Sequence, residues 1–236
     1  CALEPANPWN VIAITFTNKA AGEMKERLSN MLGASAEDIW AMTFHAACCR
    51  ILRRYIDRCG YTSSFTIYDT SDSERLMKEI LRDMNLDDKT YPPRYVLSII
   101  GRQKDRLISP EQMEEDSRSA SDYRIVQIAK AYAVYQKRLK DNNALDFDDI
   151  LYVTVKLLQQ DREVREYYQR KFHYVLVDEY QDTNFAQHSI VLQLAKEHQH
   201  VCVVGDDAQS IYSFRGADID NILYFTKVYP GTKVFK

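Results

Sequence analysis

Residues 174–182 read Tyr-Val-Leu-Val-Asp-Glu-Tyr-Gln-Asp, so a short apolar run ends abruptly in two adjacent acids. A central strand of a parallel sheet is apolar on both faces, and such sheets bind ligands just beyond the carboxyl ends of their strands. We therefore expect a buried strand that delivers Asp178 and Glu179 to a nucleotide site, where Mg²⁺ and an attacking water are needed. Taken alone, the run is also compatible with a strand that leads into a solvated turn.

A second apolar run, residues 201–204, lies about two dozen residues further on and leads into a loop that begins Gly205-Asp206-Asp207. Between the two runs, residues 184–197 carry apolar side chains at helical spacing. A strand, a helix and a strand in this order imply a crossover between parallel strands. Upstream, residues 11–15 and 39–43 are predicted to be further strands, and residues 19–32 an amphipathic helix that ends at Gly33.

Three stretches together resemble one protein family. They are AITFTNKAAGEMKERL at 13–28, VDEYQDT at 177–183 and GDDAQSIYSFRGA at 205–217. In this order and spacing they are similar to the UvrD/Rep/PcrA group of superfamily 1 DNA helicases, over residues 11–229. The resemblance implies an α/β fold, a RecA-like parallel-sheet core of the P-loop NTPase type with an inserted all-helical subdomain.

The resemblance also implies an activity. Members of this group are ATP-dependent 3′–5′ DNA helicases, which couple ATP hydrolysis to translocation on single-stranded DNA and to duplex unwinding in DNA repair or replication. The expected cofactors are ATP and Mg²⁺. The expected partners are single-stranded DNA and junctions of single- and double-stranded DNA, with no membrane.

The family implies roles for particular residues at the nucleotide site. Asp178 is expected to hold Mg²⁺ through water, because Mg²⁺ keeps much of its hydration shell. Glu179 is expected to orient and activate the water that attacks the γ-phosphate, and Gln209 to sense that phosphate. Because Gln209 lies only three residues before Tyr212, the nucleotide state and base stacking are expected to be mechanically coupled.

A second set of residues is expected to contact DNA. The family implies that the loops after the first two strands line the single-strand groove, while Phe44 is equally well explained by packing. Stacking on aromatic or guanidinium planes tolerates any base sequence, as a motor on arbitrary DNA requires. Two positions depart from the family pattern: Phe214 stands where the best-known members carry tryptophan, and Tyr180 where many carry phenylalanine. Both keep an aromatic ring, so they are expected to weaken stacking rather than to change the family assignment. The expected DNA-contacting residues are Phe16, Asn18, Thr43, His45, Tyr212, Phe214 and Arg215.

The chain from about residue 45 to 171 is almost entirely helical in period. We therefore predict a motor domain 1A at residues 1–48 and 171–236, interrupted by a helical subdomain 1B at 49–170. Basic clusters occur within the predicted helices, and a solvated helix face is favoured for them over a phosphate-contacting face. These clusters are Arg50, Arg53, Arg54 and Arg58, and Arg102, Lys104 and Arg106.

A phosphate-cradling loop requires the pattern GxxxxGK[ST], and no glycine in this sequence is followed by lysine. The chain also begins with Cys1. We therefore expect a fragment of a longer parent that starts after the phosphate loop and is inactive by itself. Two alternatives stay open: the motor of a helicase–nuclease assembly, although Asp207-Ala208 before Gln209 favours a simple helicase, and a non-catalytic DNA or protein interaction module.

Composition limits the possible classes of protein. With 236 residues, 45% of them hydrophobic, the chain can bury a substantial core. A net charge of −3 means that any nucleic-acid surface must be local. No apolar run approaches the roughly 20 residues that span a bilayer, and five cysteines without CxxC spacing argue against a disulfide framework. We therefore expect a soluble, intracellular protein. The family resemblance implies a cytoplasmic, nucleoid-associated protein of bacterial type.

Overall fold

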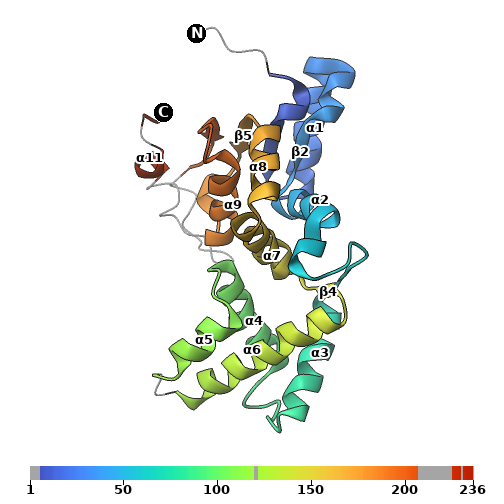
Figure 1. Cartoon of the computed structure of the whole chain (residues 1–236), viewed down its shortest axis with the longest axis vertical. Coiled ribbons are helices and arrows are strands. Elements are labelled where there is room, and N and C mark those ends of the chain that lie inside the picture. Colours follow the sequence, from blue (N-terminus) through green and yellow to red (C-terminus); the bar gives the residue numbers. More distant parts are fainter. Residues whose placement is uncertain (1–5, 120–121, 207–224, 230, 236) are drawn as a thin grey trace. The chain divides into compact units, whose positions relative to one another are not determined.

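The computed structural model describes residues 6–119, 122–206, 225–229 and 231–235. The chain divides into two compact units. The first unit comprises Cys1–Ile51 and Thr154–Lys236, and the second comprises Leu52–Val153. Figure 1 shows the course of the chain through both units, coloured from the N-terminus to the C-terminus.

The first unit is built on a four-stranded sheet in which every neighbouring pair is parallel, in the order β2-β1-β5-β6. This confirms the predicted α/β class and the parallel crossover between the last two strands. The register pairs Thr15 with Thr43, and Val177 with both Ile14 and Val203, so the strands end nearly level with one another. The strands are β1 (Val11–Thr15), β2 (Trp40–Thr43), β5 (Tyr174–Val177) and β6 (Val201–Val203).

Helices join these strands and begin and end at residues that the sequence makes suitable. Gly33, with φ of 62°, ends α1 in a backbone conformation that favours glycine. Asn184 and Gln187 form a reciprocal capping box at the start of α9. The helices with residues in this unit are α1 (Asn18–Leu32), α2 (Phe44–Tyr55), α7 (Phe147–Gln160), α8 (Arg162–Lys171), α9 (Phe185–Ala195) and α11 (Phe225–Val228), with 3-10 turns at Pro8–Asn10, Gly33–Asp38 and Tyr180–Asp182.

The two central strands differ in how fully they are buried. In β1 the consecutive residues Ile12, Ala13 and Ile14 are all buried, so both faces of this strand are covered. In β5, Val175 and Val177 are buried while Leu176 is 38% exposed. The expectation of a strand buried on both faces is therefore wrong for β5. Side chains alternate between the faces of a strand, and Cys202, which pairs with Leu176 in β6, is exposed on the same face.

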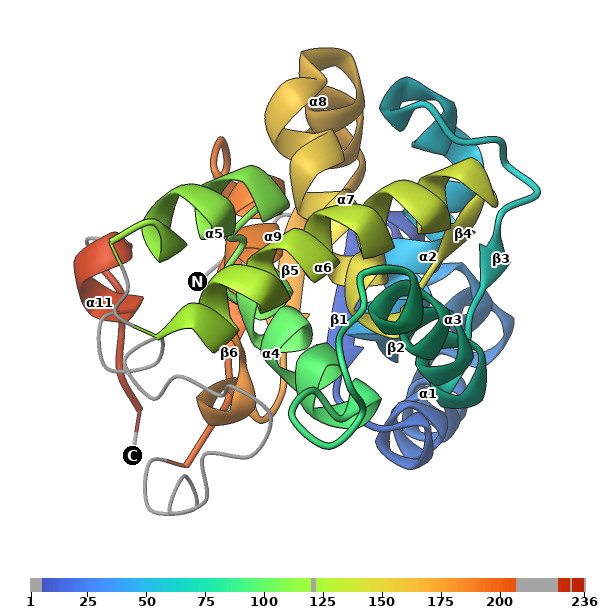
Figure 2. The ribbon, with the colours of Figure 1, turned by 90° about the horizontal axis from the view of Figure 1, so that it is seen from below.

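The second unit is helical apart from one short strand pair. Within it, α3, α4 and α5 all pack against the long helix α6 (Figure 2). The parallel pair of β3 with β4 was not predicted, because two-residue strands are too short to show a period of two. The elements are the 3-10 turn Ile56–Cys59, β3 (Thr66–Ile67), α3 (Thr70–Asp83), α4 (Pro93–Asp105), α5 (Pro110–Ser117), α6 (Tyr123–Asp141) and β4 (Ala144–Leu145).

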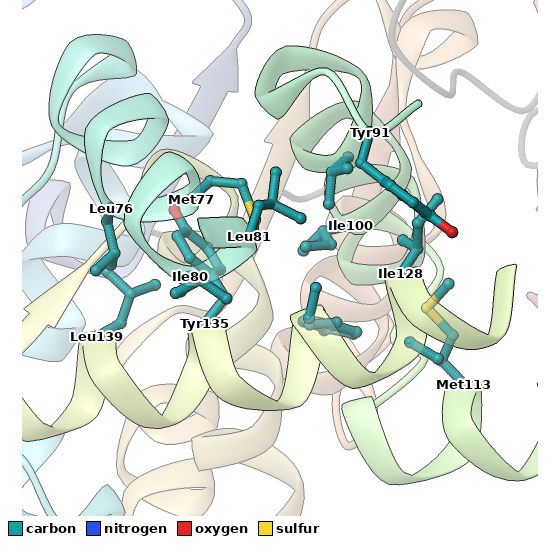
Figure 3. Packing of buried hydrophobic residues seen from close by; sticks show 14 of the residues in the cluster. Leu76, Met77, Ile80, Leu81, Tyr91, Ile100, Met113, Ile128, Tyr135 and Leu139 are labelled. Carbon is teal, nitrogen blue, oxygen red and sulfur yellow. The ribbon is translucent and has the colours of Figure 1, made fainter. Parts of the chain in front are cut away.

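An apolar cluster forms the core of this helical unit. Leu76, Met77, Ile80 and Leu81 recur at helical spacing along α3 and pack with Tyr135 and Leu139 of α6, as Figure 3 shows. Ser109 caps α5 with its side chain, as its place directly before Pro110 predicts. For α3, residues 70–72 are the candidate caps from the sequence. Asp69, rather than residues 70–72, caps α3, because its extended backbone lets its carboxylate accept the N–H of Asp72.

The boundary between the two units lies at a different residue from the one that the sequence suggested. All of α8 and the end of α7 belong to the unit that contains the sheet, where Trp40 meets Phe172 edge-on with a ring separation of 4.9 Å. A helical period does not reveal which core a helix joins, so the sequence alone assigned both helices to the insertion. The division into motor domain 1A and subdomain 1B stays a prediction.

Candidate functional site

The loops that follow the parallel strands of the first unit meet at the carboxyl edge of the sheet. The N–H of Asp178 donates to the carbonyl of Ile14 at 3.0 Å, and the N–H of Val204 donates to the carbonyl of Val177 at 2.9 Å. Backbone pairing therefore continues one residue past the strands on both sides of β5. As a result, the acidic loop after β5 starts beside the end of β1 and beside the loop after β6.

Glu179 adopts a backbone conformation that is rare for a residue with a side chain. Its φ of 51° and ψ of 42° lie in the left-handed region. The loop holds it there, because its N–H donates to Oδ1 of Asp178 at 3.0 Å and its carbonyl accepts the N–H of Asp182 at 2.9 Å. Such conformations cost about 1–3 kcal/mol and cluster at functional sites. Glu179, which the sequence predicted to activate the attacking water, is thus among the non-glycine residues that the structure holds at positive φ.

Gln181 connects this acidic loop to the loop after β6, a role that the sequence analysis missed. Its side-chain Nε2 donates to Oε2 of Glu179 at 2.6 Å, and its Oε1 accepts the backbone N–H of Asp206 at 3.0 Å. The side chain is buried, with 1% of its surface exposed. A second link joins the N–H of Tyr180 to the carbonyl of Val204 at 2.9 Å. Gln181 is one polar residue between Glu179 and Asp182 in the sequence. Neither helical spacing nor strand alternation marks such a residue, so the sequence pattern does not reveal this bridge.

Tyr180 is part of the core and not of a stacking surface. It is fully buried, its hydroxyl lies 2.6 Å from Nδ1 of His188, and its ring meets Phe225 edge-on at 5.6 Å. Burial raises the pKa of Tyr180 well above its usual value, so the hydroxyl stays protonated. The expectation that Tyr180 affects the strength of stacking is therefore wrong, because no face of its ring is accessible to a base.

The acids of this loop are few in number but of a kind that Mg²⁺ prefers. In the part of the chain that the structure describes, no three metal-ligating side chains gather in one place. Mg²⁺ is commonly bound by only one or two carboxylates, together with waters and the phosphates of a substrate. Asp178, at the sheet edge, fits that mode as the single carboxylate, and leaves Glu179 beside it for another role. Asp182 also lies nearby. The pKa of its carboxyl group is raised, first by partial burial of the group and second by the negative charge of Glu179.

Four of the predicted DNA-contacting residues lie at or just beyond the carboxyl ends of β1 and β2. Phe16 is in the loop after β1, Asn18 is the first residue of α1, Thr43 is the last residue of β2, and His45 is in the first turn of α2. Phe16 is half-buried, and its ring meets the buried ring of Phe44 edge-on at 5.6 Å, so Phe44 is a packing residue that supports Phe16. The hydroxyl of Thr43 accepts the N–H of Ala46 at 3.2 Å and so caps α2, while its own proton can still be donated. Of the other two, Asn18 is exposed and His45 is partly buried.

The remaining predicted site residues are Gln209, Tyr212, Phe214 and Arg215, which lie outside the described residues. Their roles at the nucleotide and DNA sites therefore stay predictions. Gly205 and Asp206, which precede them, are described and exposed.

All the arginines of the two basic clusters are exposed, as the favoured solvated helix face requires, and Lys104 is the exception. Lys104 is buried in an ion pair, so neither a solvated nor a phosphate-contacting face applies to it. Arg53 donates to the carbonyls of Ser63 and Phe65, and the guanidinium of Arg50 lies 4.3 Å from the centre of the Trp40 ring.

The buried thiol of Cys48 is not a reactive group. Burial raises the pKa of Cys48 to about 12, so this thiol stays protonated.

Comparison with known proteins gives consistent matches. The family described as UvrD/REP helicase N-terminal domain matches residues 2–230. The chain is 53% identical over 227 residues to the ATP-dependent DNA helicase PcrA of Bacillus subtilis (strain 168), which covers 96% of this chain and 30% of that protein. The PcrA proteins of Staphylococcus aureus (strain Mu50) and Staphylococcus epidermidis are 49% and 47% identical, over 95% and 96% of this chain.

The chain thus spans about 30% of the length of the relatives it matches. Within the described residues, the structure contains no helix that combines the length and the apolar character needed to cross a membrane.

Proposed function

Because the chain belongs to the UvrD/REP helicase N-terminal domain family, we propose that it forms part of the motor of an ATP-dependent DNA helicase. The PcrA relatives carry that activity in their names. The observation that supports the proposal most directly is the acid pair at the carboxyl end of β5, with Glu179 held in a strained backbone conformation. The 3′–5′ polarity, and a role in DNA repair or replication, rest on the family resemblance.

In this proposal the two acids have different tasks. Asp178 holds Mg²⁺ through water, and Glu179 accepts a proton from the water that attacks the γ-phosphate. When bound, Mg²⁺ neutralises charge that develops on the phosphates. Without a metal, two carboxylates would repel a polyanionic nucleotide, so the acid pair and Mg-ATP are complementary. Gln209, which lies outside the described residues, is assigned the role of γ-phosphate sensor by resemblance.

Single-stranded DNA is proposed to pass over the loops after β1 and β2. Phe16 supplies a ring that Phe44 holds in place, and such a ring can stack on any base. Asn18, Thr43 and His45 supply polar groups beside it. Tyr212, Phe214 and Arg215 join this set by resemblance alone.

The proposal is tested by substituting the two acids in the intact parent protein. Glu179→Gln should leave Mg-ATP binding within about 3-fold while lowering DNA-stimulated ATP turnover at least about 100-fold, because it removes a general base but no metal ligand. Asp178→Asn should weaken Mg-ATP binding as well. Steady-state kinetics and calorimetric titration measure both effects.

Glu26→Gln is the matched control, because Glu26 is an exposed acid on α1 of the same unit. It should change neither quantity. Turnover at the parent's rate in the Glu179 variant would contradict the proposal.

A further inference from the structure

The side chain of Gln181 makes two hydrogen bonds that join separate loops. Nε2 donates to the carboxylate of Glu179 at 2.6 Å, and Oε1 accepts the N–H of Asp206 at 3.0 Å. Glu179 and Asp206 lie in the loops that follow the adjacent strands β5 and β6. Two residues from different strand ends are therefore linked through one amide.

The chemistry of the two partners fixes the orientation of that amide. An ionised carboxylate can only accept hydrogen bonds, and a backbone N–H can only donate one. Only a side chain that carries both a donor and an acceptor can satisfy both partners at once. Since Gln181 is 1% exposed, bulk water is kept away from the amide and cannot readily replace it in this arrangement.

The bridge acts on a residue whose backbone is already strained. The left-handed conformation of Glu179 aims its side chain, and the bond from Gln181 removes rotational freedom that a free glutamate side chain would keep. A general base must lie within hydrogen-bond reach of the water from which it takes a proton. Restricting its carboxylate to one position therefore favours the reaction.

We propose that Gln181 is a positioning residue that orients the carboxylate of Glu179 and couples it to the loop after β6. This rests on the proposed function, because it presumes that Glu179 acts as the base. The loop concerned begins at Gly205 and leads within a few residues to Gln209. A shift of Asp206 is thereby transmitted to the catalytic carboxylate through one side chain.

Two substitutions separate the two bonds. Gln181→Leu removes both, whereas Gln181→Glu keeps an oxygen that can accept the N–H of Asp206 and puts a like charge against Glu179. In the intact parent, both variants should lower kcat for ATP about 10- to 100-fold and leave KM within about 3-fold, because they disturb the base and not substrate binding.

Hydrogen exchange in the nucleotide-free protein gives a readout that does not depend on activity. The amide of Asp206 should exchange faster in Gln181→Leu and at nearly the parent's rate in Gln181→Glu. Gln169→Leu is the matched control, because Gln169 is another buried glutamine of the same unit, whose Nε2 donates to the carbonyl of Gln193 at 2.8 Å. It should leave the turnover and the exchange of Asp206 unchanged.

The outcomes distinguish this inference from the proposed function. Parent-like kcat in both Gln181 variants, with Glu179→Gln inactive, would overturn the role of Gln181 and leave the proposed function standing. Full turnover in Glu179→Gln would overturn both. If Gln181→Leu fails to fold, Gln181→Glu decides by its kcat, a lowered value supporting the role and an unchanged value overturning it.

Discussion

At the scale of single residues, several buried polar side chains in the sheet unit are paired with specific partners. Tyr180 and His188 are both buried and 2.6 Å apart, and Gln181 joins Glu179 to Asp206. A buried polar group that loses its partner costs more free energy than a hydrogen bond contributes when both partners are present. Substitution of one partner is therefore an informative test of such a pair.

For the pair of Tyr180 and His188, a double-mutant cycle is expected to show coupling. Tyr180→Phe should lower the free energy of unfolding by about 1–3 kcal/mol, because it withdraws the hydroxyl from a buried imidazole. His188→Leu alone should also destabilise the protein. The double variant should cost less than the sum of the two, since both polar groups are then gone. Urea unfolding measures all four proteins.

Tyr123→Phe is the control for this cycle, because Tyr123 is 69% exposed. Its effect should stay within about 0.5 kcal/mol. Strict additivity of the Tyr180 and His188 substitutions would contradict the pairing.

Phe16 carries the second prediction at this scale. In the intact parent, Phe16→Ala should weaken binding to single-stranded DNA by about 1–3 kcal/mol, the usual value of one base stacked on an aromatic ring. Mg-ATP affinity should be unchanged. Fluorescence anisotropy with a labelled oligonucleotide measures the first quantity, and calorimetry the second.

Phe185→Ala is matched to this variant, because Phe185 is an exposed aromatic residue on α9 in the same unit. It should bind DNA like the parent. Equal DNA affinities for the Phe16 variant and the parent would remove Phe16 from the proposed groove.

At the scale of elements, a buried ion cluster joins three helices of the second unit. Nζ of Lys104 on α4 lies 2.7 Å from Asp146 and 2.8 Å from Asp149, and Gln136 on α6 donates to Asp149 at 2.8 Å. The two aspartates also accept each other's backbone N–H at the start of α7. Gly101 leaves room for this approach, because a Cβ there would lie 2.6 Å from Oδ2 of Asp148.

The charges in this cluster depend on one another. Burial lowers the pKa of Lys104, but the two carboxylates more than compensate and raise it well above its usual value. The pKa of Asp149 is raised to about 6. Burial is the larger cause, and the negative charge of Asp146 is the second. The folded state therefore binds a proton at Asp149 more tightly than the unfolded state does. Its contribution to stability falls as the pH rises from about 4 to about 6.

Removal of the lysine should be costly and dependent on pH. Lys104→Met leaves two buried carboxylates without their cation, which should lower the free energy of unfolding by about 3–5 kcal/mol at neutral pH. The deficit should shrink toward pH 5, because the unpaired carboxylates then take up protons in the folded state. Urea unfolding at several pH values measures both effects.

Lys137→Met is the control, since Lys137 and Asp141 form an exposed pair on α6. It should cost less than about 1 kcal/mol at any pH in this range. A deficit in Lys104→Met that stays constant with pH would mean that the carboxylates are not what destabilises the variant.

At the scale of the whole molecule, the two units have separate cores. The apolar cluster of the helical unit lies entirely between Leu76 and Ala144, whereas the sheet is buried by residues from both ends of the chain. A unit that is continuous in sequence and has its own core satisfies the conditions for independent folding.

We therefore expect a polypeptide of residues 52–160, which keeps α7 complete, to fold without the sheet. Circular dichroism should show a helical spectrum and one cooperative thermal transition. Ile80→Asp is the matched variant, because Ile80 is fully buried in the cluster and an aspartate there would abolish the transition. A gradual melt with strong binding of a hydrophobic dye would show that the cluster does not fold independently.

Much of this architecture was predictable because the signals are local. Apolar runs and helical periods located the four strands of the sheet and most of the helices, and the acids after residues 174–177 marked its functional edge. Contacts distant in sequence have no such signal. In the sequence, Lys104 looks like one of several surface cations. In the structure it is paired with Asp146, which lies 42 residues further along the chain.

The sequence by itself therefore determined the class of fold, the family and the acid pair, since each depends on residues that are close together in the chain. The tertiary structure alone decided which side chains meet. It buried Tyr180 against His188, assigned α8 to the sheet unit, and turned Gln181 into a bridge to Asp206 across 25 residues. The physical reason is that burial and pairing depend on which elements pack together, and the periodicity of a single element does not contain that information.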